Sequence, residues 1–308
     1  MSEFEFIKMN GLGNDFVIID QRSNELDHSS TEVQHICNRD KGIGCDQLIY
    51  IRNSEISDIP LLKFYNSDGS EISACGNGTR CVANYLMEQD NKKEIEIMTS
   101  ERKIYCQAKS NSIVSVDMGK PIFSWNKIPL SEDIDHKTIE FSYNELKVCN
   151  PFFVNLGNPH AIFFLDEIKK YNISDFGPII EHDNIFPEKI NVSFAELRDR
   201  NHIVLDVWER GAGRTLACGT AACATVVAGK ELGLSDNNVK VSLPGGDLEI
   251  DYLDNKNIIM TGPTKLDYKD RYTIWTSSIQ KKHQRFTSII LAVYAEWKSI
   301  IIKSLMKN

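Results

Sequence analysis

The chain lacks the marks of secreted, membrane-spanning and nucleic-acid-binding proteins. Its opening, MSEFEFIKMNGLGNDF, has early acidic residues and no long apolar run, so it does not read as a signal peptide. The apolar stretch IILAVYA at 289–295 is too short to cross a bilayer. The formal net charge of −8 argues against nucleic acid as a general partner. Eight cysteines in 308 residues are too sparse for a small disulfide framework. We therefore expect a cytoplasmic protein with reduced thiols, no membrane span and no nucleic-acid partner.

Two cysteine blocks stand out against this background. Residues 66–81 read NSDGSEISACGNGTRC, residues 211–224 read GAGRTLACGTAACA, and a helix-like run follows each block. A cysteine just before a helix start lies where unpaired backbone N–H groups and the positive end of the helix dipole converge. This setting predicts a lowered thiol pKa and an anion site. We predict that Cys75 and Cys218 face each other across one substrate carboxylate, with a sulfur on either side of its α-carbon.

Such a pair suits proton transfer at the α-carbon of an amino acid. Without a cofactor, that chemistry needs a base on one face of the carbon and an acid on the other. One sulfur must be thiolate and the other thiol, and the two should titrate as a coupled unit. Backbone N–H groups at the two helix starts would stabilise the developing carbanion. The residues after each cysteine, Gly76 and Asn77 in one block and Gly219 and Thr220 in the other, are then predicted carboxylate donors.

The chain also repeats itself. Asn14 in GLGNDF precedes Cys75 by 61 residues, and Asn158 in NLGNPH precedes Cys218 by 60. Nine residues before Cys75 stands Asn66, and nine before Cys218 stands Glu209. Each half then closes with a strand-like run into Met, Gly and Pro, around Met118 and Met260. We interpret this as an internal duplication.

The duplication predicts an α+β fold of two pseudo-symmetric domains. Each is expected to be an antiparallel sheet wrapped around a central helix, with the active site in the cleft between them. The expected boundaries are 1–120 for the N-terminal domain, with 262–274 packing back on it, and 121–261 for the C-terminal domain. Residues 275–308 form a tail outside both copies. Among the elements, we expect two strands around a turn at Asn14, a helix at 31–38 and a strand at 61–66.

The remaining cysteines and the one histidine of the repeat have simpler interpretations. Buried structural thiols are the expectation for Cys37, Cys45, Cys106 and Cys149. Cys81 and Cys223 follow the paired cysteines by six and five residues, offsets that turn their side chains away on a helix, so we expect them in the core. No CxxC or HxxxH spacing occurs at either block, and we predict no metal. For His160, a structural role and a ligand-contacting role are both open.

Six motifs in order resemble one family. MNGLGNDFVIID, GIGCDQ, SDGSEISACGNGTRC, LGNPHA, FPEKINV and ERGAGRTLACGTAACA are similar to diaminopimelate epimerase, and the resemblance runs over residues 4–274. It implies a cofactor-independent isomerase of lysine and peptidoglycan precursor synthesis. Such an enzyme interconverts LL- and meso-2,6-diaminopimelate through Cys75 and Cys218, and we expect a homodimer. His160 and Glu209 would support proton transfer. The implied substrate contacts are Asn14, Gln47, Asn66, Asn158, Asn191, Glu209 and Arg210.

Four departures from the family pattern carry expectations of their own. Asn10 stands where the family has His, which should alter packing more than chemistry. Ala221 replaces a Gly inside the expected second helix, where Ala is favourable. Arg214 replaces an acid and would lower the pKa of the Cys218 thiol. The tail from 275 carries an amphipathic stripe, which fits either a membrane or partner surface or a cover for the protein's own apolar patch.

Other functions stay open on the residues alone. Another racemase or isomerase of the same duplicated architecture would use the same two cysteines. A thiol-redox switch would respond to glutathione without exchanging an α-proton. A pure binding protein would tolerate Ser at both cysteine positions.

Overall fold

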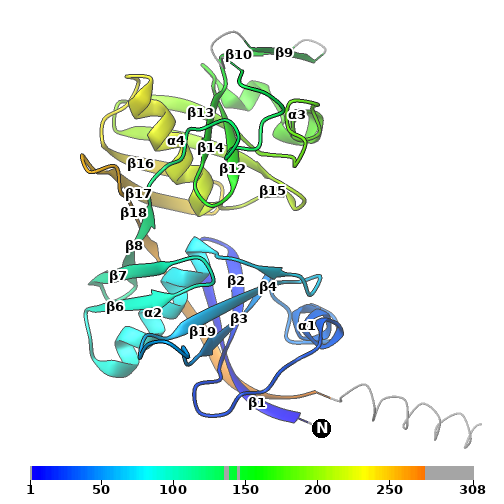
Figure 1. The fold of residues 1–308 in the computed structure, drawn as a ribbon, viewed down its shortest axis with the longest axis vertical. Helices are drawn as coiled ribbons and strands as arrows, with labels where there is room; N and C mark the ends of the chain where they lie inside the picture. Colours follow the sequence, from blue (N-terminus) through cyan, green and yellow to red (C-terminus); the bar gives the residue numbers. More distant parts are fainter. Residues whose placement is uncertain (1, 135–138, 144–145, 275–308) are drawn as a thin grey trace, which may run out of the picture.

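The computed structural model describes residues 2–134, 139–143 and 146–274, and in it the chain forms two stacked halves (Figure 1). The first half begins at the N-terminus and is completed by the last described strand. The second half holds the green and yellow elements of Figure 1. Within the described residues, no helix is both long and apolar enough to pass through a membrane.

The first half contains eight strands and two helices in chain order. They are β1 (Ser2–Gly11), β2 (Asn14–Asp20), α1 (Ser30–Cys37), β3 (Gln47–Arg52), β4 (Leu61–Asn66), β5 (Glu71–Ile72), α2 (Gly76–Asp90), β6 (Glu94–Met98), β7 (Lys103–Ser110) and β8 (Ile113–Gly119).

The second half follows the same plan after a small hairpin. The hairpin is β9 (Glu140–Tyr143) and β10 (Leu146–Cys149). The rest are β11 (Phe152–Asn155), β12 (Pro159–Phe164), the short 3₁₀ helix η2 (Ile168–Lys170), α3 (Ile173–Glu181), β13 (Asn191–Asp199), β14 (His202–Glu209), β15 (Gly213–Thr215), α4 (Gly219–Glu231), β16 (Asn238–Leu243), β17 (Gly246–Tyr252) and β18 (Ile258–Pro263), and β19 (Lys265–Ile274) then returns to the first half.

Strand pairing repeats between the halves, which confirms the duplication. In the first half β1–β2, β3–β4, β4–β5, β6–β7 and β7–β8 are antiparallel, while β2–β3 and β4–β6 are parallel. In the second half β11–β12, β13–β14, β14–β15, β16–β17 and β17–β18 are antiparallel, while β12–β13 and β14–β16 are parallel. The predicted α+β class is therefore confirmed, with two parallel pairings in each half beside the antiparallel ones.

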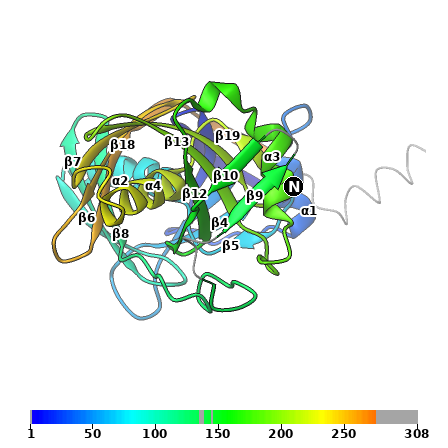
Figure 2. The same cartoon turned by 90° about the horizontal axis from the view of Figure 1, so that it is seen from above.

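One helix lies at the centre of each half. Helix α2 packs among β1, β6, β7 and β8, and α4 packs among β11, β12, β13 and β17. Both helices are buried over most of their length, and small residues such as Ala221, Ala222 and Ala224 let the sheet approach α4 closely. The view from above shows the sheets wrapped around α2 and α4 (Figure 2). A second apolar core in each half lies under the outer helix, α1 or α3.

The two halves are joined by strands as well as by helices. Strand β18 of the second half pairs antiparallel with β8 of the first, from Ile258 opposite Gly119 to Pro263 opposite Ile113. Strand β19 then pairs along β1, with Ile274 opposite Ser2. Strand β19 therefore lies along the first half, and the domain boundaries at 120 and 261 and the assignment of 262–274 stay predictions. The predicted amphipathic stripe of the tail lies outside the described residues.

Candidate active site

Both paired cysteines are the N-cap residues of the central helices. Cys75 precedes α2 in an extended conformation, and its Sγ accepts a hydrogen bond from the backbone N–H of Gly78 at 3.4 Å. Cys218 precedes α4 in a similar conformation, with its Sγ 3.4 Å from the Thr220 hydroxyl. Cys75 is half-buried and Cys218 is buried. The predicted position of each thiol at a helix start is confirmed.

The two helix starts touch each other. The Asn77 side-chain amide on α2 donates to the Ala217 carbonyl, just before Cys218, at 3.5 Å. A Cβ on Gly219 would lie 3.3 Å from the Asn77 amide oxygen and 2.8 Å from the sulfur of Met260. A Cβ on Gly76 would lie 2.9 Å from the same methionine's methyl group. Glycine begins both helices because Met260, wedged between the halves, leaves no room for a side chain.

Burial reverses the predicted pKa direction of both thiols. Burial raises the pKa of Cys75 to about 11, the Glu209 carboxylate adds to this, and the N–H of Gly78 and the charge of Arg80 oppose it. Burial also raises the pKa of Cys218 well above its ordinary value, with the Glu209 charge as the next cause. The helix start does favour the thiolate, as predicted. In the absence of a bound charge, however, desolvation outweighs it, so the sequence-based expectation of lowered thiol pKa values was wrong.

Glu209 is the acid partner of Cys218. It ends β14, and its carboxylate accepts a 2.5 Å hydrogen bond from the Thr215 hydroxyl on β15. Burial raises the pKa of Glu209, while hydrogen bonds from Thr215 and Cys218 work in the other direction. The charge of this carboxylate also raises the pKa of the Cys218 thiol, so the two groups influence each other.

His160 lies fully buried on β12 with one nitrogen engaged. Its Nε2 is 2.9 Å from the side-chain oxygen of Asn158, whereas its Nδ1 is buried without a partner among the described residues. Burial, then the charge of Arg210, lowers the pKa of His160 to about 3. The imidazole is therefore neutral at ordinary pH, so it can accept or relay a proton only as the neutral base.

Amide side chains line the same strand ends. Asn14 is 4.0 Å from the Cys75 sulfur through its Oδ1, and its Nδ2 donates to Asp46 at 2.9 Å. On the neighbouring strands, Gln47 donates to the Asn66 side-chain oxygen at 3.3 Å. Asp46 holds the Asn14 amide in place, a role that the motif GIGCDQ had not indicated.

The second half arranges its polar residues in the same register. Asn191 donates to the Pro159 carbonyl at 2.7 Å and accepts from the backbone N–H of Arg210 at 2.9 Å. The guanidinium of Arg210 donates to the carbonyl of Glu188 at 3.1 Å. His160 stands opposite Asn191 in the parallel β12–β13 pair, as Phe16 stands opposite Gln47 in β2–β3. The structure therefore brings the predicted residues of each half to matching strand ends.

Buried polar atoms without a partner gather among these residues. Three of the predicted site residues carry one each: Gln47 through Oε1, Asn77 through Oδ1 and His160 through Nδ1. A buried donor or acceptor without a partner is costly, and native structures hold few of them. An amino-carboxylate ligand offers donors and acceptors that would satisfy such atoms.

Other residues singled out from the sequence lie away from the thiols. Arg214 pairs with Asp206 on β14 at 3.0 Å and is not among the charges that act on Cys218, so the expected lowering of that pKa was wrong. Cys37, Cys45, Cys81, Cys106 and Cys223 are buried, as expected, and the Cys149 side chain lies outside the described residues. Asn10 accepts a hydrogen bond from the Gly13 N–H at 2.9 Å, and Ala221 lies in the first turn of α4.

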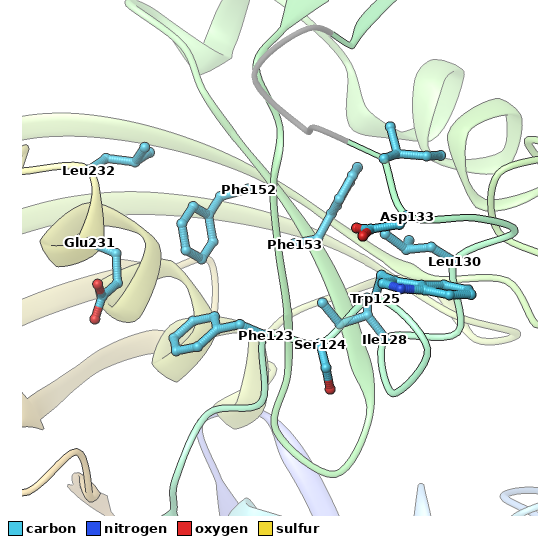
Figure 3. Close-up of a pocket in the computed structure, with 11 residues that line it drawn as sticks. Phe123, Ser124, Trp125, Ile128, Leu130, Asp133, Phe152, Phe153, Glu231 and Leu232 are labelled. Atoms are coloured by element: carbon cyan, nitrogen blue, oxygen red, sulfur yellow. The ribbon is translucent and has the colours of Figure 1, made fainter.

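A separate pocket lies in the second half, away from both cysteines (Figure 3). It has a volume of about 620 Å³, and aromatic side chains including Phe123, Trp125 and Phe152 line it beside Glu231 and Leu232 at the far end of α4. It contains no thiol and no predicted site residue. Across the described part of the chain, no cluster of three His, Cys, Asp or Glu side chains is placed to hold a metal ion.

The comparison with known proteins covers residues of both halves. The family model described as diaminopimelate epimerase matches residues 6–124 and 152–266. A protein of Pelagibacter ubique (strain HTCC1062) named diaminopimelate epimerase is 42% identical over 264 residues, covering 85% of this chain and 96% of that protein. A relative of the same name from Carboxydothermus hydrogenoformans is 42% identical over 277 residues, covering 87% and 99%.

Solved structures share the fold at lower identity. A phenazine biosynthesis protein of the PhzF family from Bacillus anthracis superposes with a TM-score of 0.64 at 15% identity, covering 89% of this chain and all of that one. A hydroxyproline epimerase from Agrobacterium vitis, with bound trans-4-hydroxy-L-proline, gives 0.63 at 11% identity, covering 87% and 92%. At such identities the likeness concerns the fold alone.

Proposed function

Because the chain belongs to the diaminopimelate epimerase family, we propose that Cys75 and Cys218 are the two proton carriers of its reaction. The chain is an isomerase that interconverts LL- and meso-2,6-diaminopimelate. The observation that carries the residue assignment is the meeting of two helix starts, each capped by a cysteine, at the junction of the halves.

The proposed reaction moves one proton onto the protein and another off it. The thiolate on one face takes the α-proton, so a C–H bond breaks and an S–H bond forms. The thiol on the other face gives its proton to the carbanion, so an S–H bond breaks and a C–H bond forms with inverted configuration. The enzyme then holds the opposite thiolate, and the reverse reaction restores it.

The helix starts stabilise the charge in this scheme. The substrate α-carboxylate would accept backbone N–H groups from Gly76, Asn77, Gly219 and Thr220, where the positive ends of α2 and α4 point. A negative charge that gathers on this carboxylate as the proton leaves strengthens the same hydrogen bonds. Once the substrate has displaced water, the site keeps a low dielectric, in which such contacts act strongly.

Polar residues on the strand ends would hold the rest of the substrate. Diaminopimelate carries a second amino-carboxylate group, and we assign its recognition to Asn14, Gln47, Asn66, Asn158, Asn191, Glu209 and Arg210. Arg210 is suited to pair with a carboxylate in a bidentate manner. A site with these polar partners would reject lysine, which lacks the second carboxylate. His160 beside Asn158, and Glu209 beside Cys218, would relay protons to the thiols.

We also propose that the protein works in the cytoplasm as a homodimer. The reduced cysteines found in the described residues suit a reducing compartment. Exposed Leu266 and Tyr268 on β19, an edge strand paired only with β1 among the described strands, offer an apolar face to a second copy. Sedimentation of the purified protein would report the assembly state.

A substrate panel tests the proposed function. We expect the purified protein to convert LL-diaminopimelate into the meso form, measured by chiral chromatography, and to leave L-lysine and L-proline unchanged. Turnover of proline without turnover of diaminopimelate would replace this function by that of another racemase of the same fold. A protein that changes none of the three, yet cycles between dithiol and disulfide with glutathione, would favour a redox switch.

A further inference from the structure

Arg80 is a buried cation with no acidic partner. It lies one turn and a half into α2, five residues after Cys75, and it is 0% exposed. In the part of the chain that the structure describes, it is the one buried arginine and it forms no ion pair with a carboxylate. Its Nη1 donates to the sulfur of Met260 at 3.4 Å, while Nε and Nη2 have no partner within residues 2–134, 139–143 and 146–274. A thioether is a weak acceptor, so the guanidinium is left almost unsatisfied.

The backbone at the junction of the halves forms a close cradle for this group. A Cβ on Gly262 of β18 would lie 3.2 Å from the Arg80 Cζ, and a Cβ on Gly11 of β1 would lie 3.4 Å from its Nη2. The side chain therefore crosses from the helix of the first half to the strand that links both halves. An unpaired charge in such a place costs stability, and an apolar side chain of similar volume would not. A buried cation held at this cost points to a role beyond packing.

The groups that respond to this charge are thiols. Cys75 and Cys81 on the same helix and Cys223 on α4 are the titratable side chains that act on Arg80. Burial raises the pKa of Cys81 and Cys223 to about 12, above the value of about 11 for Cys75. Other titratable side chains on the strands around α2 each have a partner of their own. The pairs are Lys8 with Asp15, Lys103 with Glu96, Tyr105 with Glu94, Asp117 with Asn257 and Asp267 with Lys265. Cys75 is thus the most acidic of the three thiols that Arg80 influences.

The two halves carry different charged residues at matching positions near their cysteines. Position five after Cys75 holds Arg80, and position five after Cys218 holds Cys223, so only the first half supplies a cation there. Position nine before Cys75 holds Asn66, and position nine before Cys218 holds Glu209, so only the second half supplies an anion there. A cation favours a neighbouring thiolate, and an anion disfavours it.

We propose that Arg80 is a positioning charge which makes Cys75, rather than Cys218, the thiol that ionises first. The inference rests on the proposed two-thiol function and adds which of the two thiols acts first as the base. When Cys75 loses its proton while Cys218, beside Glu209, keeps its own, the enzyme is prepared for one of the two substrate configurations. The other configuration then meets its base only after the proton has crossed from Cys218 to Cys75.

Site-resolved alkylation measures this without turnover. Iodoacetamide reacts with thiolates, and mass spectrometry of peptides gives the rate at each cysteine as a function of pH. The midpoint of each curve corrects for the different access to a half-buried and a buried sulfur. We expect the Cys75 midpoint of the unchanged protein to lie below that of Cys218. A lower midpoint at Cys218 would overturn the proposal, whatever the variants do.

Two substitutions separate charge from packing. Arg80→Met keeps the length of the side chain and removes the charge, and we expect its melting temperature not to fall. Its Cys75 midpoint should rise by about one pH unit, so that labelling below the midpoint slows about tenfold, and the acidic limb of kcat/KM should move with it. Arg80→Lys restores the charge and should recover most of both shifts. Cys81→Ala, a neighbouring buried change, should move neither.

Each result decides between charge and structure. An unmoved Cys75 midpoint in Arg80→Met, or equal losses in Arg80→Met and Arg80→Lys, would show that Arg80 serves packing alone. A shifted midpoint in a protein that does not epimerise diaminopimelate would leave the charge effect standing and remove the proposed function. Epimerisation without a shift of the Cys75 midpoint would leave the proposed function standing and remove the charge effect.

Discussion

The two halves share their strand pairing and differ in the residues placed on it. Each half has a cysteine at the start of its central helix. Each also has an asparagine at the start of a strand, Asn14 at β2 and Asn158 directly before β12. Three matched positions break the symmetry: Phe16 against His160, Asn66 against Glu209, and Arg80 against Cys223. The duplication thus places one cysteine sulfur from each half at the start of a central helix. The differences supply unequal charge, which a reaction with one acid and one base requires.

The electrostatics of the thiols follow this difference. Burial dominates at both sites, which places the pKa of Cys75 at about 11 and that of Cys218 well above its ordinary value. Glu209 raises the pKa of both thiols, while Arg80 lowers the pKa of Cys75. A bound substrate would add its ammonium group, a positive charge that favours the thiolate and so lowers the pKa of a neighbouring thiol.

The largest expected effect comes from removing either sulfur. Cys75→Ala and Cys218→Ala should each lower kcat for epimerisation by at least about 10²–10⁴-fold, because one face of the α-carbon then lacks its proton carrier. Both proteins should keep the circular dichroism spectrum of the unchanged enzyme. Chiral chromatography of the product measures the loss in each direction.

Matched changes one turn further along give the control. Cys81→Ala and Cys223→Ala remove buried thiols of the same two helices, both at 0% exposure. We expect some loss of stability from the small cavities and turnover within a few-fold of normal. Near-normal turnover in Cys218→Ala would contradict the assignment of one sulfur to each face.

A second pair of changes makes the halves more alike at the position nine before each cysteine. Glu209→Gln removes the carboxylate, so the pKa of Cys218 should fall while the proton relay is lost, and kcat should drop about 10–100-fold. Asn66→Asp adds a carboxylate at the matching place and should raise the pKa of Cys75. Alkylation of each cysteine against pH reports both shifts, and unmoved curves in both variants would remove the argument from charge.

His160→Phe places in the second half the residue that the first half carries as Phe16. His160 ionises at about 3 in the folded protein and near 6.5 in the unfolded chain, so the unfolded state binds more protons between these values. Stability should therefore rise with pH across this window and be lost as pH falls through it, by up to about 1.4 kcal/mol per pH unit from this group. Urea unfolding at pH 4, 5 and 7 measures the slope.

The variant should lose that part of the slope. Any constant cost of fitting a larger ring affects all three pH values equally, so the comparison of slopes is unaffected by it. Equal pH dependence in the two proteins would show that His160 is protonated in the fold or exposed to solvent.

The smallest effect is expected from the segment that belongs to neither half. The predicted site residues all precede β18, and β19 ends at Ile274 opposite Ser2. Truncation after Thr276 should therefore leave kcat and KM within about twofold and change solubility or assembly at most. A folded, soluble and inactive truncation would place the tail in the catalytic machinery.

Local patterns allowed the fold and the thiol positions to be predicted. Spacings of 61 and 60 residues between an Asn and a Cys, and the strand and helix signals between them, fixed the duplication and both helix starts. The helix expected at 31–38 is α1 at Ser30–Cys37, and the strand expected at 61–66 is β4. These features depend on neighbours in the chain, which the sequence displays directly.

Features that depend on contacts between distant residues could not be predicted. Met260 lies against the start of both helices, 184 and 41 residues from Gly76 and Gly219. Arg80 was hidden in the motif GNGTRC, because nothing in the sequence shows that its guanidinium has no acidic neighbour. The wrong sign for the thiol pKa values has the same origin, since desolvation depends on how the other half covers each sulfur.

Solvent isotope incorporation tests the two-thiol account most directly. LL-diaminopimelate is incubated with the enzyme in deuterium oxide, and NMR of the early reaction mixture follows the α-positions of substrate and product. Two carriers on opposite faces predict deuterium at the inverted carbon of meso-diaminopimelate while the remaining LL-substrate still carries protium. Protium retained in the product, or deuterium appearing equally fast in the recovered LL-substrate, would show that a single group handles both faces and would contradict the account.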